Sequence, residues 1–477
     1  MKNEEVCWTI CPECQGRGKT RRRLTRKERL RYQEIEKTNP EDASFVRPPG
    51  ALTPCQNCGS SGLIPSSSNP IPNKEYPHIA IIGGGIGGVA LAVACVHRGI
   101  PFTLYERDSS FDARSQGYGL TLQQASNAIR GFGLFSLNGG VNSTRHVVHT
   151  TDGKEIVEWG MRTSKQEGAK GFPKRTNVHI ARQSLRLALL EQLKGNDAVK
   201  WGYQLVDYKR EAGDSINMSF KVNGEIWSAK ADLLVGADGI RSSVRRLLIG
   251  EDDTPLRYLG FMVILGICPI SNLENLNNPL LDLRTVFQTV NGNDRLYMMP
   301  YSSDTIMWQL SFPMTENDAK VLSALGPQVL KEEACQRTQW HEPIPQIMAG
   351  TPEIHITGYP VYDRELLSPE ILHKGGPVTL IGDAAHPMSP FKGQGANQAL
   401  LDALVLARGI FSGCGPFSNW REAGVRKNVL IEFESEMLAR CASKVKDSAE
   451  AAMLLHSNIV LREGDGLKTR GLNRREV

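Results

Sequence analysis

The pattern that most constrains this 477-residue chain is a short apolar run followed at once by closely spaced glycines. Residues 79–82 (IAII) include no polar position, which is typical of a strand buried on both faces of a parallel sheet. Gly83, Gly85 and Gly88 follow in the G-x-G-x-x-G spacing, and an apolar helix is expected through residues 89–96. The sequence therefore predicts an α/β fold of the Rossmann type, in which a helix N-terminus accepts an anion.

A second strand with an acidic end supports the same interpretation. Gly99 can end the helix, residues 102–105 form a short strand, and Glu106 follows 18 residues after Gly88. An acid roughly 20 residues beyond the glycines binds a dinucleotide ribose in folds of this kind. The alternative is a glycine-rich turn without a ligand. The order of strand, helix, strand and acid favours the dinucleotide site.

Two further apolar runs end in glycine and aspartate. Residues 231–235 lead to Asp238 in the segment GADGIR, and residues 378–381 lead to Asp383 in GDAAHPMSPFKGQGAN. A nicotinamide-dependent dehydrogenase needs only one such unit. Together, in this order, the three segments resemble those of the FAD-dependent aromatic hydroxylases, the group A flavoprotein monooxygenases, and most of all their tetracycline-inactivating and phenolic hydroxylase branch.

The resemblance implies which residues hold FAD. The family's counterpart of Asp383 binds the ribityl chain, the segment with Asp238 lies beside the pyrophosphate, and the histidine at 386 is structural. Two arginines, at 182 and 114, fall where family members contact the cofactor, although a solvated surface charge is the alternative for each. The implied cofactor-binding residues are Gly83, Gly85, Gly88, Glu106, Arg107, Arg114, Arg182, Asp238, Gly382, Asp383, Pro390, Gly393, Gly395, Ala396 and Asn397.

The resemblance also implies the reaction. No second G-x-G-x-x-G occurs in the chain, so NAD(P)H is expected to bind transiently beside the flavin and reduce it. With O2, a C4a-hydroperoxyflavin then hydroxylates a phenolic, aromatic or polycyclic small molecule. The motifs identify no catalytic side chain. Alternatives are a Baeyer–Villiger or epoxidising monooxygenase and, outside the enzymes, a flavin-binding regulatory protein that uses its N-terminal unit to engage a partner.

Strand and helix patterns divide the chain into four expected parts. A zinc-knuckle unit with a basic helix and linker covers residues 1–70. The Rossmann-type FAD-binding domain comprises residues 76–139, 172–252 and 345–408. An antiparallel β-sheet domain for the substrate comprises residues 140–171 and 253–344, with strands at 257–270, 284–289, 295–300 and 305–312. A C-terminal helical segment covers residues 409–460. The residues of this sheet considered as ligand contacts are Met298, Met299, Trp308 and Gln309.

The N-terminal unit carries two C-x-x-C pairs, each followed by glycine. Cys11, Cys14, Cys55 and Cys58 suit a closed tetrahedral Zn site, and the pairs resemble knuckles of the DnaJ-type zinc domain, although only two of that domain's four repeats are present. Cys7 is an alternative ligand. Disulfides and a redox-active pair are the other interpretations. A Pro/Ser-rich stretch at 65–72 reads as a linker, so we expect the FAD-binding fold to survive loss of the unit.

A basic segment lies between the two cysteine pairs. Residues 17–37 hold ten Lys or Arg against three Glu, whereas the whole chain has a net charge of +5. Thr25 and Glu28 match a capping box, which predicts a helix. That helix could contact nucleic acid, an acidic membrane or a protein, or could simply be solvated. No apolar run approaches membrane-spanning length, and the N-terminus lacks a signal-peptide core, so a cytoplasmic enzyme is expected.

Overall fold

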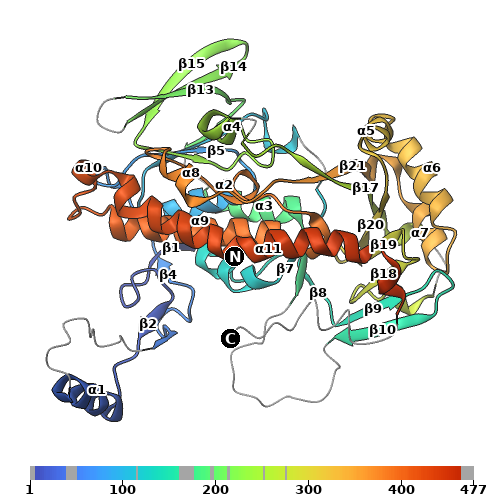
Figure 1. Ribbon diagram of the computed structural model, residues 1–477, viewed down its shortest axis with the longest axis horizontal. Coiled ribbons are helices and arrows are strands. Elements are labelled where there is room, and N and C mark those ends of the chain that lie inside the picture. Colours follow the sequence, from blue (N-terminus) through green and yellow to red (C-terminus); the bar gives the residue numbers. More distant parts are fainter. Residues whose placement is uncertain are drawn as a thin grey trace.

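The structure is a computed structural model with three visible parts: a sheet domain, a cofactor-type α/β body and a small N-terminal unit (Figure 1). A long helix, α11 (Ile431–Leu455), runs across the first two parts. The residues that the structure describes are 6–38, 51–113, 117–160, 177–193, 198–211, 215–250, 253–273 and 277–462.

The α/β body is built on a five-stranded sheet in which every neighbouring pair is parallel. Its strands, in spatial order, are β12 (Val199–Trp201), β6 (Phe102–Glu106), β5 (Ile79–Ile82), β16 (Leu233–Gly236) and β22 (Val378–Leu380). The three strands that lead into glycine motifs, β5, β16 and β22, are neighbours and are buried along their whole length. Their carboxyl ends therefore meet at one edge of the sheet, where ligands bind in folds of this class.

The helices of the body differ slightly from the expected ranges. Helix α2 (Ile86–Val96) begins three residues earlier than the expected 89–96 and packs along α9 (Gly395–Gly413). Gly395 and Ala396 form the first turn of α9. The remaining elements of the body are α3 (Arg182–Glu191), α4 (Ser243–Ile249), the small sheet β7 (Gly119–Leu122), β11 (Val178–Ala181) and β8 (Val141–Asn142), and the hairpin sheet β13 (Gln204–Arg210), β14 (Ile216–Val222) and β15 (Glu225–Ala231).

The second part is a seven-stranded sheet. Its strands in spatial order are β10 (Glu155–Gly160), β9 (Arg145–His149), β18 (Thr285–Val290), β19 (Arg295–Pro300), β20 (Thr305–Pro313), β17 (Arg257–Pro269) and β21 (Ile356–Asp363). The strands expected from the sequence correspond to β17, β18, β19 and β20. Helices α5 (Glu316–Ala324), α6 (Pro327–Arg337) and α7 (Ile344–Gly350) cover its outer face (Figure 1).

One predicted domain boundary differs from the observed structure. The sequence predicts residues 345–408 to belong to the FAD-binding domain, whereas β21 pairs antiparallel with β17 along residues 356–363. Arg257 of β17 forms a bidentate ion pair with the buried Asp363 of β21, at 2.8 and 2.9 Å. Strand β21 therefore belongs to the seven-stranded sheet, as its edge strand. The chain then continues into α8 (Pro369–His373) and β22 of the α/β body.

The N-terminal unit is a repeat with an offset of 44 residues. Strand β1 (Cys7–Ile10) pairs with β4 (Leu63–Ser66), and β2 (Lys19–Arg21) pairs with β3 (Leu52–Pro54). The backbone bonds are reciprocal: Cys11 N donates to Gly62 O at 2.8 Å, and Cys55 N donates to Gly18 O at 3.0 Å. Helix α1 (Arg26–Thr38) begins at the expected capping box, since the amides of Thr25 and Glu28 each donate to the other's side chain.

This unit packs against the α/β body. Trp8 stacks on Phe135 with ring centroids 4.5 Å apart, and Arg408 of α9 donates to Gly16 O at 2.9 Å. The linker therefore does not hold the unit away from the body (Figure 1). None of the described helices is long and apolar enough to cross a membrane.

Candidate functional site

The glycines between β5 and α2 have three different physical roles. Gly83 has φ +107°, and a Cβ there would lie 2.5 Å from Ala237 O. A Cβ on Gly88 would lie 1.9 Å from Gly83 O, so only glycine allows the helix to approach the strand. At Gly85 the nearest atom to an added Cβ is Arg182 Nη2, 3.8 Å away. Space is therefore open beside Gly85, where an anion can approach the first turn of α2.

A small cavity of about 180 Å³ lies over this turn. Three of the residues predicted to contact a dinucleotide line it, namely Glu106, Arg107 and Arg182. The Glu106 carboxylate accepts hydrogen bonds from the amides of Gly84, at 2.6 Å, and Asp108, at 3.0 Å. These two hydrogen bonds fix the orientation of Glu106. Because a carboxylate offers about four acceptor positions, the side chain can still accept a hydrogen bond from a ligand hydroxyl.

Asp238 lies at the edge of the same cavity but also has a structural role. Its carboxylate accepts from the Ser242 hydroxyl and from the amides of Ser243, at 2.7 Å, and Val244, at 3.3 Å. It therefore satisfies the free N–H groups at the start of α4. Burial raises the pKa of Asp238, while these hydrogen bonds act in the opposite direction.

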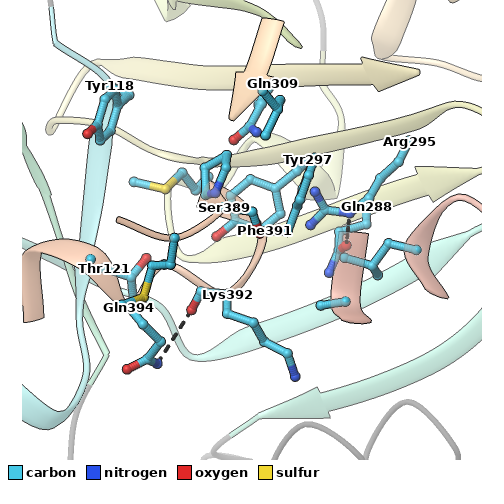
Figure 2. Close-up of a pocket in the computed structure, with 18 of the residues that line it drawn as sticks. Tyr118, Thr121, Gln288, Arg295, Tyr297, Gln309, Ser389, Phe391, Lys392 and Gln394 are labelled. Carbon is cyan, nitrogen blue, oxygen red and sulfur yellow. Dashed lines mark hydrogen bonds between the residues drawn. The ribbon is translucent and has the colours of Figure 1, made fainter. Parts of the chain in front are cut away.

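A larger cavity of about 1210 Å³ lies between the α/β body and the seven-stranded sheet (Figure 2). The segment after β22 and the start of α9 form one wall. Its predicted cofactor residues that line the cavity are Asp383, Pro390, Gly393, Gly395 and Ala396. Gly382, at φ +58°, makes the turn that presents Asp383.

Asp383 is enclosed by protein, yet its side chain is exposed to the cavity. Burial raises its pKa, and the charges of His386 and Arg182 oppose that rise. A Cβ on Gly395 would lie 3.4 Å from Asp383 Oδ1, so the carboxylate lies beside the first turn of α9. A hydrogen-bond acceptor and a helix N-terminus thus face the same space, which suits a ligand with hydroxyl donors and an anionic ring.

Two arginines connect the cavities. Arg241 lines both of them. Arg182, the first residue of α3, lines the small cavity, and its guanidinium carbon lies 5.6 Å from the ring centroid of Tyr118, which lines the large one. Together the cavities form an elongated site. Arg114, also predicted as a contact, lies outside the described residues.

The side chain of Asn397, another predicted cofactor residue, is used within the protein. Its side-chain amide donates to Thr121 O and Gly393 O, both at 2.9 Å. Its oxygen accepts from the amides of Gln123, at 2.9 Å, and Ala125, at 3.1 Å. With 1% of its surface exposed, Asn397 has no side-chain group left for a cofactor. It holds the chain after β7 against the start of α9 and is a positioning residue.

Strands form the floor of the large cavity, and alternate side chains along each strand face the cavity. Met299 and Gln309 line the cavity. Met298 and Trp308 point to the other face, where they join the core beneath α5–α7. Trp308 donates from Nε1 to Thr351 Oγ1 at 2.8 Å, which satisfies its only polar group. Of the four residues considered as ligand contacts, two therefore face the cavity.

The cavity also contains a cation that the motifs did not indicate. Arg295 is 4% exposed, lines the cavity, and donates from Nε to Gln288 Oε1 at 2.8 Å (Figure 2). Its guanidinium lies 5.1 Å from the ring centroid of Tyr297 and 5.9 Å from that of Phe391. Burial lowers its pKa to about 10. The only hint in the sequence is an arginine that opens the otherwise apolar strand RLYMMP.

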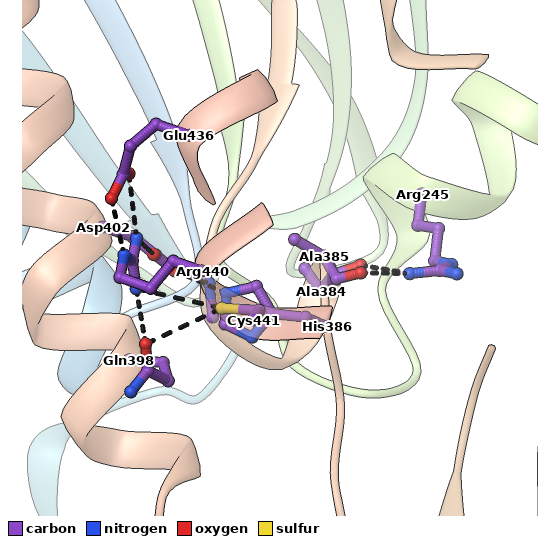
Figure 3. A network of polar contacts seen from close by, with 10 residues as sticks. Arg245, Ala384, Ala385, His386, Gln398, Asp402, Glu436, Arg440 and Cys441 are labelled. Carbon is purple, nitrogen blue, oxygen red and sulfur yellow. Dashed lines mark hydrogen bonds and ion pairs between the residues drawn. The ribbon is translucent and has the colours of Figure 1, made fainter. Parts of the chain in front are cut away.

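His386 is buried in a network behind the cavity (Figure 3). Its Nε2 lies 2.7 Å from Asp402 Oδ2, and the same carboxylate oxygen accepts from Gly382 N at 2.8 Å. Arg440 of α11 donates to Asp402 Oδ1 at 2.8 Å. Asp402 thereby ties the turn that carries Asp383 to α9 and α11. The expected structural role of His386 fits this arrangement, whereas its partners could not be identified from sequence spacing.

The charge state of His386 gives a stability prediction. Burial alone would lower its pKa, but the Asp402 carboxylate raises it to about 10. A histidine has a pKa of about 6.5 when unfolded, so its contribution is complete below that pH and is lost as pH rises through about 10. We expect the unfolding free energy to fall by up to about 1.4 kcal/mol per pH unit across that window. Urea unfolding from pH 6 to 10 measures it, and His386→Gln should flatten the profile.

The four cysteines of the N-terminal unit form a compact buried cluster. The Sγ atoms of Cys11 and Cys55 lie 3.9 Å apart, those of Cys14 and Cys58 lie 3.7 Å apart, and all four lie within 4.8 Å of one another. Tetrahedral coordination with Zn–S bonds of about 2.3 Å requires sulfur atoms about 3.8 Å apart. The four thiols therefore have the spacing of a tetrahedral metal site. Cys7 is not part of the cluster.

Comparisons with known proteins agree with a cofactor-binding site of this kind. Residues 76–412 match the model of a family described as "FAD binding domain". The aurachin C monooxygenase/isomerase of Stigmatella aurantiaca is 31% identical over 336 residues, which cover 69% of this chain and 79% of that protein. The 3-amino-4-hydroxybenzoate 2-monooxygenase PtnB3 of Streptomyces platensis is 30% identical over 344 residues, covering 70% of this chain and 80% of that protein.

Solved structures share the fold at lower identity. FqzB superposes with a TM-score of 0.67 at 20% identity and covers 86% of this chain and 92% of that one. The tetracycline destructase Tet(51) superposes with a TM-score of 0.58 at 19% identity and covers 84% and 98%. The glycine cradle, the elongated site and the family match lead to one conclusion. The chain is an enzyme that belongs to the FAD-dependent, aromatic-type monooxygenases, the group A flavoproteins that its motifs resemble.

Proposed function

We propose that the protein is an NAD(P)H-dependent monooxygenase that hydroxylates an aromatic or polycyclic small molecule. The observation that carries this proposal is the elongated site, which runs from the open turn at Gly85 past Arg182 to Asp383 and the large cavity. Its length suits an extended dinucleotide with space left beside the ring for a substrate. When bound, FAD supplies the redox chemistry that activates oxygen.

The residues of this chain would bind and orient the cofactor. The first turn of α2 offers backbone N–H groups to the pyrophosphate, and Glu106 accepts from a ribose hydroxyl. Asp383 accepts from the ribityl hydroxyls. The start of α9, at Gly395 and Ala396, lies where its N-terminal dipole can stabilise negative charge on a reduced ring. Arg107 and Arg182 offer positive charge near the phosphates.

The sheet and α11 would hold the substrate and exclude water. Apolar and aromatic side chains of the cavity, such as Met299 and Tyr297, suit a ring. Arg295 and Gln288 offer hydrogen-bond donors at the far wall, beside Tyr297 and Phe391. They favour a substrate that carries a carboxylate, phenolate or enolate group. One relative is named for an aminohydroxybenzoate, a substrate of this description.

We also propose that Cys11, Cys14, Cys55 and Cys58 hold one structural Zn²⁺. The support is the spacing of four buried sulfur atoms, together with amide donors to two of them. Gly18 N donates to Cys14 Sγ and Gly62 N donates to Cys58 Sγ, both at 3.2 Å. N–H groups that point at sulfur favour thiolate over thiol. All ten cysteines are free of disulfides.

Substrate coupling tests the proposed reaction. Because reduction and oxygen chemistry would share one cavity, a poorly fitting ring should stimulate NAD(P)H oxidation but release hydrogen peroxide. Across a series of hydroxybenzoates, phenols and polycyclic phenols, product and peroxide yields should add up to the NAD(P)H consumed. Oxygen uptake with ¹⁸O₂ and mass analysis of the products measure this. Stoichiometric peroxide with every ring, and no ¹⁸O in any product, would contradict the hydroxylase assignment.

A further inference from the structure

Two arginines of the α/β body converge on the N-terminal cysteine cluster. Arg98, just after α2, is 4% exposed, and a Cβ on Gly16 would lie 3.5 Å from its Nη2. Arg408, in α9, donates from Nε to Gly16 O at 2.9 Å. Gly16 belongs to the turn that follows Cys14. Both guanidinium groups therefore lie against the first C-x-x-C knuckle, at the ends of α2 and α9 remote from the cofactor site.

Neither of these two charges has an acidic partner in the part of the chain that the structure describes. Among the described residues, no Asp or Glu forms an ion pair with Arg98 or Arg408. Arg98 donates from Nη1 to Ala94 O at 2.9 Å, and its Nε is buried without a partner. An arginine guanidinium keeps its proton in proteins, so Arg98 is charged at neutral pH. A buried charge without a counter-ion is strongly destabilising.

We infer that the four-cysteine cluster, once it holds the divalent metal proposed above, is the counter-ion of Arg98 and Arg408 and couples metal binding to FAD binding. Four thiolates and one divalent ion carry a net charge of −2, which matches two guanidinium groups. Two disulfides, or four thiols, would carry no charge and would leave both arginines uncompensated.

The coupling follows from the two helices. Helix α2 begins at the glycine turn of the small cavity, and α9 begins at Gly395 in the large cavity. They pack along each other and reach the cysteine cluster through Arg98 and Arg408. When the metal is lost, two like charges remain close together, with Arg98 buried and Arg408 partly buried, and the favourable response is a shift of the helix ends. Such a shift disturbs both helix N-termini that face the cofactor.

Two comparisons test this inference. One measures FAD binding with and without metal, and the other measures zinc binding with and without the charge at position 408. Zinc-loaded full-length protein and protein stripped by a chelator in the presence of a thiol reductant are titrated with FAD by fluorescence. We expect FAD to bind about 5- to 150-fold more weakly to the stripped protein, the usual range for coupled sites. In Arg408→Met the zinc affinity, measured against a chromogenic chelator, should fall about tenfold or more, because one counter-charge is gone. Arg408→Lys keeps the charge and should stay within about threefold of wild type.

The matched control is Arg21→Met, which removes an exposed charge from β2 in the same unit and should leave zinc affinity unchanged. Equal zinc affinities in the Met and Lys variants, or equal FAD affinities with and without metal, would overturn the inference while leaving the monooxygenase assignment intact. Protein that takes up no zinc after reconstitution would overturn this inference and the proposed metal site together. FAD binding by the loaded protein reports separately on the proposed enzyme.

Discussion

Asp383→Ala is expected to weaken FAD binding by about 5- to 150-fold. The carboxylate is the acceptor that the turn after β22 presents to the large cavity. Its loss would leave ribityl hydroxyls unpaired at roughly 1–3 kcal/mol per buried group, and each 1.4 kcal/mol is about a factor of ten in affinity. Flavin absorbance of the purified protein and equilibrium dialysis with FAD measure the change. Asp383→Asn keeps an acceptor oxygen and should bind FAD more tightly than Asp383→Ala.

The control for that measurement is Asp447→Ala. Asp447 lies in α11, lines the outer part of the same cavity and is exposed. Its removal changes the cavity charge by the same amount but should leave FAD content at the wild-type level. If Asp383→Ala and Asp447→Ala purify with equal, undiminished flavin, then Asp383 does not hold the cofactor and the placement of the ribityl chain is wrong.

The double variant Cys11→Ser, Cys14→Ser is expected to lose zinc and the order of the N-terminal unit. Structural zinc contributes on the order of 10 kcal/mol to units of this size, and this unit has few other buried apolar side chains. Elemental analysis should change from about one Zn per chain to none. Trp8, which stacks on Phe135, should become mobile and shift its fluorescence toward that of exposed indole.

Cys7→Ser is the matched control because Cys7 lies in β1 and outside the cluster. It should retain the metal. Loss of zinc from Cys7→Ser would show that Cys7 replaces one of the four proposed ligands. The α/β body has its own extensive core and should stay folded in the double variant, although with the weaker FAD affinity inferred above.

The parts of the candidate site that the sequence indicates most directly depend on local backbone needs. Gly83 and Gly88 can only be glycine, because a side chain would collide with backbone oxygen atoms. Such positions leave a fixed spacing in the sequence. Glu106 and Asp383 follow apolar strands directly, so the end of each strand places them at the carboxyl edge of the sheet.

The parts that sequence reasoning missed depend on contacts between distant residues. Asp402 and Arg440 join His386 only because α9 and α11 cross behind the cavity, and each looks like an ordinary helix-surface charge. Asn397 belongs to a motif that the family places at the flavin, yet its amide is used entirely by backbone groups. Ser60 takes φ +71°, where its counterpart Gly16 has φ +75°, so the second knuckle keeps the same turn although serine replaces the glycine.

The two ends of helix α2 carry opposite partial charges. Its N-terminal turn has partial positive charge and faces the expected phosphates, and its C-terminal end has partial negative charge and meets Arg98. Arg98 in turn lies against the first knuckle of the proposed zinc site. With FAD and the proposed metal bound, phosphate, helix, guanidinium and metal–thiolate centre would form a column of alternating sign about one helix long. Because most of this column is shielded from solvent, salt should weaken it far less than it weakens contacts on the exposed basic helix α1.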